Sequence, residues 1–323
     1  MEHRPEMALQ QAVDGWVEQK RKYTKTGEAA SYIPELQEAD PNALGIVIIG
    51  SDGTKITSGD TNTPFSIQSI SKVFSFIVAC MQHGVSRVLK RVDVEPTGEP
   101  FNSLAHLEVK KAEKPLNPMV NTGAITVTSM LEGDTPEEKL EGLFGLYESI
   151  IGRPPKIIRN VYESEKETAH RNRAIGYMLL EMGVLASDLD VTLDAYFKQC
   201  AMEVYPEDLA KLGLVLANDG VDHLAGKEVI PKEIARLAKV LMVTCGMYDA
   251  SGKFAAEVGV PAKSGVAGGI MAAVPPQVKK EHVPFTDGCG IGLYGPALDE
   301  QGNSVAGIQL LRHLSERWDW SIF

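Results

Sequence analysis

The sequence predicts an α+β protein in which both ends of the chain build one antiparallel sheet and an all-helical lobe is inserted between them. Three observations support this fold class. Short β-branched segments occur near residues 43–58 and 266–294, helix signals dominate the stretch between them, and no repeat or low-complexity linker divides the chain. We therefore predict a single domain over 1–323, with a sheet lobe at about 1–68 and 246–323 and a helical lobe at about 69–245.

The N-terminal part predicts a helix followed by a β-hairpin. Leu9, Val13 and Trp16 recur among polar residues, as is typical of an amphipathic helix, here over 7–23. Residues 27–42 are expected to form a loop. The β-branched run 43–50, a turn at 51–53 and a return strand from residue 55 then lead directly into a helix at Ser69.

Helices are expected through the middle of the chain. Residues 93–120 are rich in Pro and Asn and look irregular, and a helix opens near Asn121. Thr135-Pro136-Glu137-Glu138 is a capping box with proline in the first helical turn, so a helix should run from there to Ile151. After a polar stretch at 160–173, further helices are predicted at about 174–183, 191–202, 206–218 and 231–244.

The C-terminal part predicts strands at 266–274 and 282–294 and a closing helix at 303–318. Gly290 to Gly295 matches G-x-G-x-x-G, but Pro296 follows and no helix opens there. We interpret the glycines as a strand bend or turn rather than a dinucleotide site.

Composition excludes several classes of function. The net charge of −11 argues against nucleic acid or an anionic membrane as partner. The first residues are polar, unlike a signal peptide, and the longest apolar run, 73–81, is too short to span a bilayer. The four cysteines lie far apart, which favours free thiols in a cytoplasmic protein. No histidine cluster has metal-ligand spacing, so we expect no metal and no cofactor.

Ser69-Ile70-Ser71-Lys72 stands at the head of the apolar run 73–81. If a helix begins here, Ser69 and Lys72 share a face at the buried N-terminal end of a central helix. Burial and the helix dipole both disfavour an ammonium ion, so the pKa of Lys72 should fall. A neutral lysine can activate a serine hydroxyl as a nucleophile. S-x-x-K also arises by chance, and alone it proves little.

Lys263-Ser264-Gly265 strengthens this interpretation. A lysine, a Ser or Thr, and a glycine at the start of a strand form the partner element of S-x-x-K in penicillin-binding proteins and class A β-lactamases. There the strand edge faces the nucleophile, and its N–H groups can help to form an oxyanion hole.

Polar residues elsewhere are further candidates, each with a structural alternative. Tyr32 and Tyr248 could simply be packed in the core with satisfied hydroxyl groups. Glu165 could be an exposed acid on a helix surface. Asn121 and Asn172 lie in polar stretches of the predicted helical lobe.

Taken together, these residues resemble the serine-dependent glutaminases of bacterial type, which are similar to the catalytic domain of the kidney and liver enzymes. The matching blocks follow the family's order: Tyr32-Ile33-Pro34, Gln68 to Lys72, Asn117 to Ile125, Ser164 to Glu167, Arg171-Asn172, Tyr196-Phe197, Cys245 to Asp249 and Pro261 to Gly269. The resemblance implies a β-lactamase/DD-peptidase-like fold, hydrolysis of L-glutamine to L-glutamate and ammonia, no metal, and a homo-oligomer, either a dimer or a tetramer.

The resemblance also implies roles for individual residues. Ser69 would be the nucleophile and Lys72 its base, Tyr248 would assist proton transfer to ammonia, and Tyr32 would lie beside the reacting amide. The N–H groups of Ser69 and Val266 would form the oxyanion hole. The groups that hold the α-amino and α-carboxylate groups of the substrate would be Asn121, Glu165, Asn172 and Tyr196.

Two alternatives remain at this stage. One is a penicillin-binding or β-lactam-hydrolysing protein, which would have no need of Glu165 and Asn172. The other is an amino-acid-binding module that kept the pocket and lost turnover.

Overall fold

The computed structural model describes residues 3–31, 33–98, 113–277 and 283–323. At its centre is a five-stranded antiparallel sheet in the order β2-β1-β9-β8-β7. Its strands are β1 (Gly45–Gly50), β2 (Lys55–Gly59), β7 (Ala262–Ser264), β8 (Gly269–Val274) and β9 (Cys289–Tyr294). The predicted antiparallel sheet built from both ends of the chain is confirmed, because β1 pairs directly with β9.

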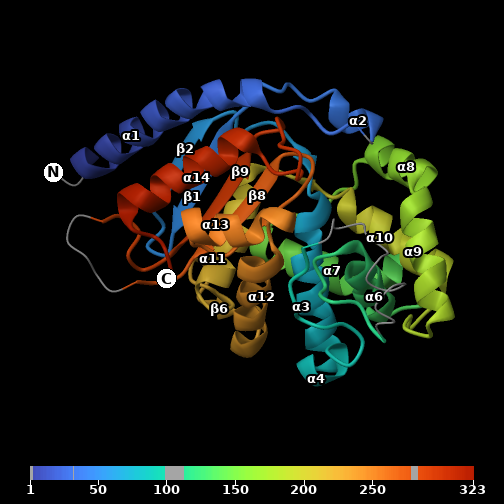
Figure 1. Ribbon diagram of the computed structural model, residues 1–323. Coiled ribbons are helices and arrows are strands. Elements are labelled where there is room, and N and C mark those ends of the chain that lie inside the picture. Colours follow the sequence, from blue (N-terminus) through green and yellow to red (C-terminus); the bar gives the residue numbers. More distant parts are fainter. Residues whose placement is uncertain (1–2, 32, 99–112, 278–282) are drawn as a thin grey trace.

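The two faces of the sheet are covered by different helices (Figure 1). Side chains alternate along a strand, so Ile46 and Ile48 pack with the terminal helices α1 (His3–Arg21) and α14 (Val305–Trp318). Val47 and Ile49 face the other way and pack against Ala210 and Leu214 of α11 (Pro206–Ala217). All six residues of β1 are buried, as a strand covered on both faces requires.

The glycines of the G-x-G-x-x-G match are explained by α11. A methyl group added to Gly290 would lie 1.9 Å from the carbonyl oxygen of Ala210, and one added to Gly292 would lie 1.7 Å from that of Pro206. The glycines therefore let a helix backbone approach the sheet closely. They lie within β9, so the predicted bend or turn is wrong.

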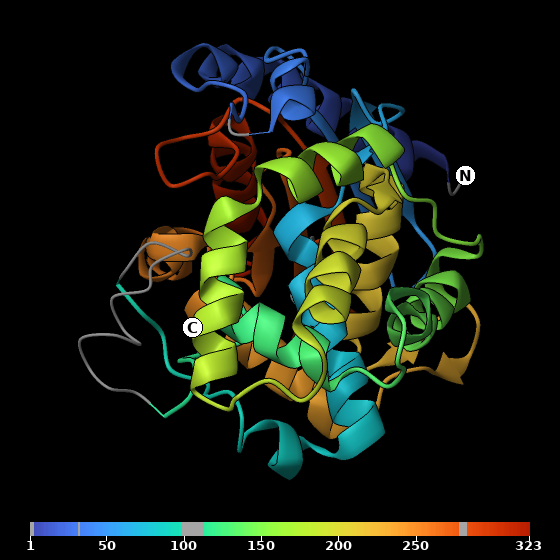
Figure 2. The ribbon, with the colours of Figure 1, turned by 90° about the vertical axis from the view of Figure 1, so that its right-hand side faces the viewer.

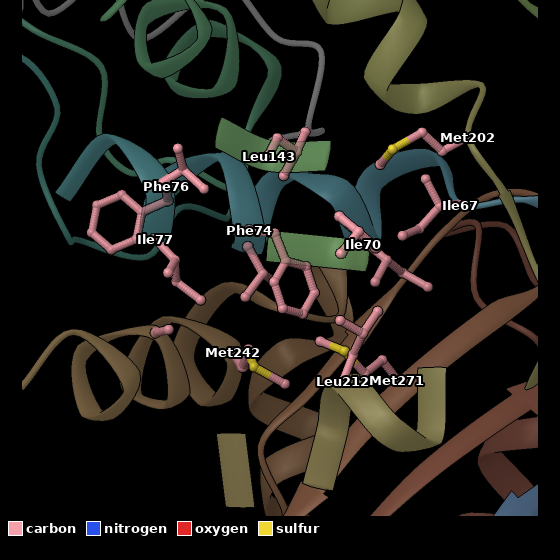
Figure 3. Packing of buried hydrophobic residues seen from close by; sticks show 14 of the residues in the cluster. Ile67, Ile70, Phe74, Phe76, Ile77, Leu143, Met202, Leu212, Met242 and Met271 are labelled. Carbon is pink, nitrogen blue, oxygen red and sulfur yellow. The ribbon is translucent and has the colours of Figure 1, made fainter. Parts of the chain in front are cut away.

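Helix α3 (Ser71–His83) runs through the middle of the helical part of the molecule (Figures 1 and 2). Every residue from Ser71 to Cys80 is buried, in agreement with the apolar run in the sequence. Figure 3 shows Phe74 and Ile77 on the side of Met242, while Leu143 lies across the helix from them. A helix enclosed on all sides cannot shift without disturbing its neighbours, so it is a rigid mount for the residues at its N-terminus.

The remaining helices complete the helical part of the molecule or flank the sheet. In chain order these elements are η1 (Lys22–Thr26), α2 (Pro34–Gln37), η2 (Gln68–Ile70), α4 (Val85–Val88), α6 (Asn121–Met130), α7 (Pro136–Ile151), α8 (Arg159–Thr168), α9 (His170–Glu181), α10 (Leu189–Cys200), α12 (Lys232–Cys245), η3 (Tyr248–Ala250) and α13 (Ser251–Glu257). Two short strand pairs complete the structure: β3 (Phe65–Ser66) with β4 (Glu203–Val204), and β5 (Val221–Asp222) with β6 (Lys227–Glu228).

Several local predictions need correction. The expected loop at 27–42 contains α2, started by Pro34 at its first turn. The polar stretch 160–173 is largely helical: α8 and the start of α9 turn Val161 inward and leave most of the charges outside, with Glu165 as a buried exception. The predicted strand 266–274 begins only at Gly269, and a separate strand, β7, precedes it.

The capping box at the start of α7 is confirmed. Thr135 Oγ1 accepts from the N–H of Glu138, whose carboxylate accepts from the N–H of Thr135, and left-handed Gly152 ends the helix. Within the described ranges, no helix is long and apolar enough to cross a membrane.

Candidate active site

Ser69 lies in a 3-10 turn that leads directly into α3. The residue before it, Gln68, has a left-handed backbone with φ of +51°, a conformation that costs free energy in a non-glycine residue. Ser71 Oγ donates to the carbonyl oxygen of Gln68 at 2.7 Å and helps to hold this turn. In a turn of this kind, side chains three residues apart point the same way. Ser69 and Lys72 are therefore presented on one side, as the sequence predicts.

Lys72 is fully buried. Its Nζ donates to Asn121 Oδ1 at 2.6 Å and to the carbonyl oxygen of Met119 at 3.2 Å. Burial lowers the pKa of Lys72 to about 8, although the nearby Cys200 and Glu165 act in the opposite direction. The predicted burial and pKa direction are both confirmed, and near pH 8 about half of the amine is available as a base.

Asn121, the first residue of α6, joins the lysine to the substrate side of the site. Its Oδ1 accepts from Lys72 and, at 3.4 Å, from the hydroxyl of Tyr196 on α10. Its Nδ2 donates to Asn172 Oδ1 of α9 at 2.9 Å. One amide thus fixes three side chains from α3, α9 and α10.

Glu165 is buried, not exposed on a helix surface. It is 8 % exposed on α8, and its Oε2 accepts no hydrogen bond from any described residue. Burial raises the pKa of Glu165 to about 8, and the positive charge of Lys72 opposes the rise. A buried acceptor without a donor costs free energy, so a cationic ligand that supplied donors would be bound favourably.

Ser69, Asn121 and Glu165 line one pocket of about 330 Å³, and the amine of Lys72 lies behind it, bonded to Asn121. The lining residues come from α8, α9, α10, η2, the start of α6 and the residues just before α2 and α9: Ile33, Gln68, Ser69, Asn121, Glu165, Thr168, Ala169, Arg171, Asn172, Tyr196 and Cys200. Size alone does not identify it, since a hollow of about 690 Å³ beside α12 and the C-terminal residues is larger. The smaller pocket is the one that combines a hydroxyl group with a buried amine and a buried acid.

Tyr248 reaches the same centre from η3. A hydrogen bond links its hydroxyl to Ser69, and burial raises the pKa of Tyr248 to about 12 despite this bond. The hydroxyl also donates to the carbonyl oxygen of Ser264 at 3.5 Å. Tyr248 has φ of +52°, a second left-handed residue at this centre. Its raised pKa keeps the phenol protonated at neutral pH.

The edge strand β7 lies against the turn that carries Ser69. A methyl group added to Gly265 would lie 2.7 Å from the carbonyl oxygen of Ile67 and 3.3 Å from Gln68 Cβ. Lys263 is fully buried, donates to the carbonyl oxygens of Gly246 and Ser264, and lies 4.3 Å from the ring centroid of Tyr248. Burial and the charge of Lys72 hold the pKa of Lys263 well below its usual range.

Of the predicted site residues, seven lie at this pocket or are bonded to the residues that line it: Ser69, Lys72, Asn121, Glu165, Asn172, Tyr196 and Tyr248. Val266 is buried in the turn that follows β7. Gly265, the residue before it, packs beside η2. Tyr32 lies outside the described residues.

Gln68, Arg171 and Cys200 also line the pocket, although no sequence pattern assigned them a site role, and Lys263 was expected only as part of the Lys-Ser-Gly element. Gln68 and Arg171 stand next to predicted residues, and Cys200 is one helical turn after Tyr196, so helical spacing could have found it.

Chemically, the site combines a serine, a lysine with a lowered pKa, a protonated phenol and a strand edge. These are the components of acyl transfer through a serine ester. The acid and amides beside them suit a ligand that carries both an ammonium and a carboxylate group.

Known proteins share this sequence and fold. A family model described as "Glutaminase" matches residues 27–323. The glutaminase of Oceanobacillus iheyensis is 62% identical over 315 residues, which cover 98% of this chain and 95% of that protein. The crystal structure of a probable glutaminase of Bacillus subtilis is similar, with a TM-score of 0.92, 52% identity and 98% of each chain covered.

A further structure shows the Bacillus subtilis glutaminase in a covalent complex with 5-oxo-L-norleucine, formed by reaction with 6-diazo-5-oxo-L-norleucine. It has a TM-score of 0.88 and 51% identity, and covers 97% of this chain and 99% of that one.

Proposed function

This chain belongs to the glutaminase family and hydrolyses the side-chain amide of glutamine, and we propose that it does so through a glutamyl ester on Ser69. The observation that carries the proposal is the buried amine of Lys72, which shares Asn121 with the pocket that Ser69 lines. An amine with a pKa near 8 is well matched to a base that works near neutral pH.

Acylation begins when Lys72 takes the proton of the Ser69 hydroxyl and the oxygen attacks the amide carbon of glutamine. The tetrahedral oxyanion is held by the N–H groups of Ser69 and Val266. The bond between carbon and nitrogen then breaks, and Tyr248 delivers a proton so that the nitrogen leaves as ammonia. Tyr248 suits this step because it stays protonated and touches Ser69.

Deacylation reverses the roles. Water attacks the ester carbon and gives its proton to the phenolate left on Tyr248. The ester bond to Ser69 then breaks as Lys72 returns its proton to the serine oxygen, which releases glutamate and restores both groups. Tyr32 beside the reacting amide is part of the same proposal.

Substrate binding uses the rest of the pocket. The carboxylate of Glu165 pairs with the α-ammonium group, and the amide and hydroxyl groups of Asn121, Asn172 and Tyr196 hold the amino-acid end of glutamine. The unpartnered Oε2 of Glu165 supports this assignment, since the ligand would supply the missing donors.

The test compares Ser69→Ala with Ser75→Ala. Ser75 is a buried serine of α3 whose hydroxyl donates to the carbonyl oxygen of Lys72. Ammonia release from glutamine should be abolished only in Ser69→Ala. Mass spectrometry after treatment with 6-diazo-5-oxo-L-norleucine should find one adduct, on Ser69, in the wild type and in Ser75→Ala. Glutamine turnover by Ser69→Ala, or an adduct on another residue, would reject this nucleophile.

Substrate comparison addresses the alternatives. The same ammonia assay with asparagine, and hydrolysis of a chromogenic β-lactam, would separate a glutaminase from a β-lactam-hydrolysing enzyme. Binding of glutamine without turnover by the wild type would indicate a binding module.

We further propose that the protein is a cytoplasmic homo-oligomer, either a dimer or a tetramer. We propose that it works without a metal, a cofactor, nucleic acid or a membrane. The division of the chain into a sheet lobe and a helical lobe stays a prediction. Tyr177 and Leu180 support self-association: they lie three residues apart on α9 and are 63% and 50% exposed. Light scattering of the wild type and of Tyr177→Glu tests the assembly, and a monomeric wild type contradicts it.

A further inference from the structure

The turn Asp299–Asn303, between the sheet and α14, lies beside Tyr248. It is tightly bonded within itself. Asp299 Oδ1 accepts from the N–H groups of Gln301 and Asn303, at 3.0 and 2.9 Å, and the N–H of Asp299 donates to the carbonyl oxygen of Asn303 at 2.8 Å. Such a turn is a rigid element on which a side chain can be mounted.

Asn303 connects this turn to the backbone of the site. It is fully buried, and its Nδ2 donates to the carbonyl oxygen of Met247 at 3.2 Å. That carbonyl belongs to the peptide bond that enters Tyr248. The Oδ1 of Asn303 has no hydrogen-bond partner among the described residues. Burying an amide with its oxygen unsatisfied costs free energy. Since Asn303 makes one side-chain hydrogen bond at this cost, we interpret that bond as one that positions the peptide.

The backbone that Asn303 holds is strained. Tyr248 has φ of +52°, and its neighbours fix it from both sides. The N–H of Met247 donates to Ser251 Oγ, which itself donates to the carbonyl oxygen of Tyr248. A left-handed tyrosine persists only where the surroundings over-determine it, and such strain concentrates at functional sites.

Gly302 brings the turn against the ring itself. Its φ is +92°, and an added methyl group would lie 3.6 Å from Tyr248 Cε2 and 3.4 Å from Val266 Cγ1. The turn therefore passes close to both the tyrosine ring and the residue proposed for the oxyanion hole.

We propose that the 299–303 turn is a positioning element for Tyr248, in which Asn303 clamps the peptide before the tyrosine and Gly302 backs its ring. Neither residue touches the substrate. They hold the hydroxyl of Tyr248 at Ser69 against the tendency of the strained backbone to relax. The proposal depends on the role of Tyr248 in proton transfer given above.

A double-mutant cycle on the full chain tests the clamp. Asn303→Leu keeps the branched shape of the side chain and removes the donor, and kcat for glutamine should fall about 10- to 100-fold, with KM changed less than about threefold. In a Tyr248→Phe background, where there is no hydroxyl to position, the same substitution should change kcat by less than about twofold.

A matched control is Ser304→Ala. Ser304 is the buried neighbour of Asn303, and its Oγ accepts from the N–H of Gly307 at the start of α14. Its loss should lower the melting temperature without changing kcat. Gly302→Ala is a second variant in case Asn303→Leu does not fold. It forces an alanine into a left-handed backbone against the ring, and its loss of kcat should also vanish in Tyr248→Phe.

The outcomes are distinct. If Tyr248→Phe keeps wild-type kcat, the proton-transfer role is rejected and the positioning role with it. If Tyr248→Phe is impaired but folded Asn303→Leu and Gly302→Ala keep wild-type kcat, or lose the same factor in both backgrounds, only the positioning proposal is overturned.

Discussion

Two buried lysines bracket helix α6, one at each end, and they have opposite surroundings. Lys72 and Lys139 are 0% and 1% exposed, and each stands in the first turn of its own helix. The amine of Lys72 meets the start of α6, where it bonds Asn121 Oδ1. The amine of Lys139 meets the end of α6, where it bonds the carbonyl oxygens of Ser129 and Leu131.

The difference is electrostatic. The C-terminal end of a helix carries partial negative charge and leaves carbonyl groups that need donors, so an ammonium ion is favoured there. The N-terminal end is positive and disfavours it. Burial lowers the pKa of both lysines, to about 8 for Lys72, and the negative charge of Asp134 opposes the fall at Lys139.

The pair therefore separates two uses of a buried amine. Lys139 serves as a cap for α6, and its charge is useful. Lys72 is held where its charge is unfavourable, which makes the neutral, basic form accessible. In the proposed mechanism, burying the amine of Lys72 beside this helix end lowers the stability of the fold and supplies a base.

The largest contrast is expected from Lys72→Met. We expect kcat to fall by about 10³-fold or more, because the serine loses its base. The melting temperature at pH 7 should stay the same or rise, since an unfavourable buried charge is replaced by an apolar chain. Steady-state kinetics and thermal denaturation measure both, and retained activity would remove Lys72 from the mechanism.

Glu165→Gln tests the other buried ionisable group of the pocket. KM for glutamine should rise roughly 10- to 100-fold through loss of a charged hydrogen bond, with a smaller change in kcat. The matched control is Glu163→Gln on the exposed side of the same helix, where the acid pairs with Arg159. An unchanged KM in Glu165→Gln contradicts the α-ammonium role.

Lys139→Met should have the opposite profile to Lys72→Met. Removing the amine leaves two buried carbonyl groups at the end of α6 without their donor, so the free energy of unfolding should fall by about 1–3 kcal/mol. Urea denaturation measures this loss. Values of kcat and KM should match the wild type, and a large loss of kcat in folded protein would erase the distinction between the two lysines.

The pH dependence sharpens the comparison further. Lys72 must lose a proton to act, and Glu165 must lose one to pair with the substrate, and both have a pKa of about 8. We therefore expect kcat/KM to rise with pH from 6 to 8 and then level off, as one coupled limb with a slope approaching about 2 in log units. In Glu165→Gln the slope should fall toward about 1. A profile that is flat between pH 6 and 8 contradicts the proposed base.

The smallest effect is expected from Thr135→Ala, at the start of the helix that carries Lys139. Loss of the cap should lower the free energy of unfolding by about 1 kcal/mol and leave kinetics unchanged. Thr135→Ser should restore most of the lost free energy of unfolding in the same denaturation experiment. If Thr135→Ala loses more free energy of unfolding than Lys139→Met, the cap of α7, and not the amine of Lys139, is the main stabilising element where α6 and α7 meet.

Sequence patterns predicted those features that depend on near neighbours along the chain. The capping box at Thr135, the amphipathic first helix, the β1–β2 hairpin and the position of Ser69 and Lys72 at the start of a buried helix all rest on spacings of a few residues. The apolar run 73–81 likewise predicted the burial of α3.

Features that depend on distant partners were missed or misjudged. The β3–β4 pair joins residues 65–66 to 203–204, which share no local pattern. Glu165 is acidic and lies among charged neighbours, so only the packing of α8 against the pocket explains its burial. The hydrogen bond from Asn303 to Met247 joins two ordinary loop sequences.

By itself the sequence determined the antiparallel sheet built from both chain ends, the order of most helices, and the presence of a serine and a lysine on one side of a buried helix start, because these follow from periodicity, turn chemistry and short spacing. Only the tertiary structure decided which charges are taken out of water, and beside which helix ends. Electrostatic free energy depends on burial and distance in space, so it is fixed only when α3, α6, α8 and β7 have packed together.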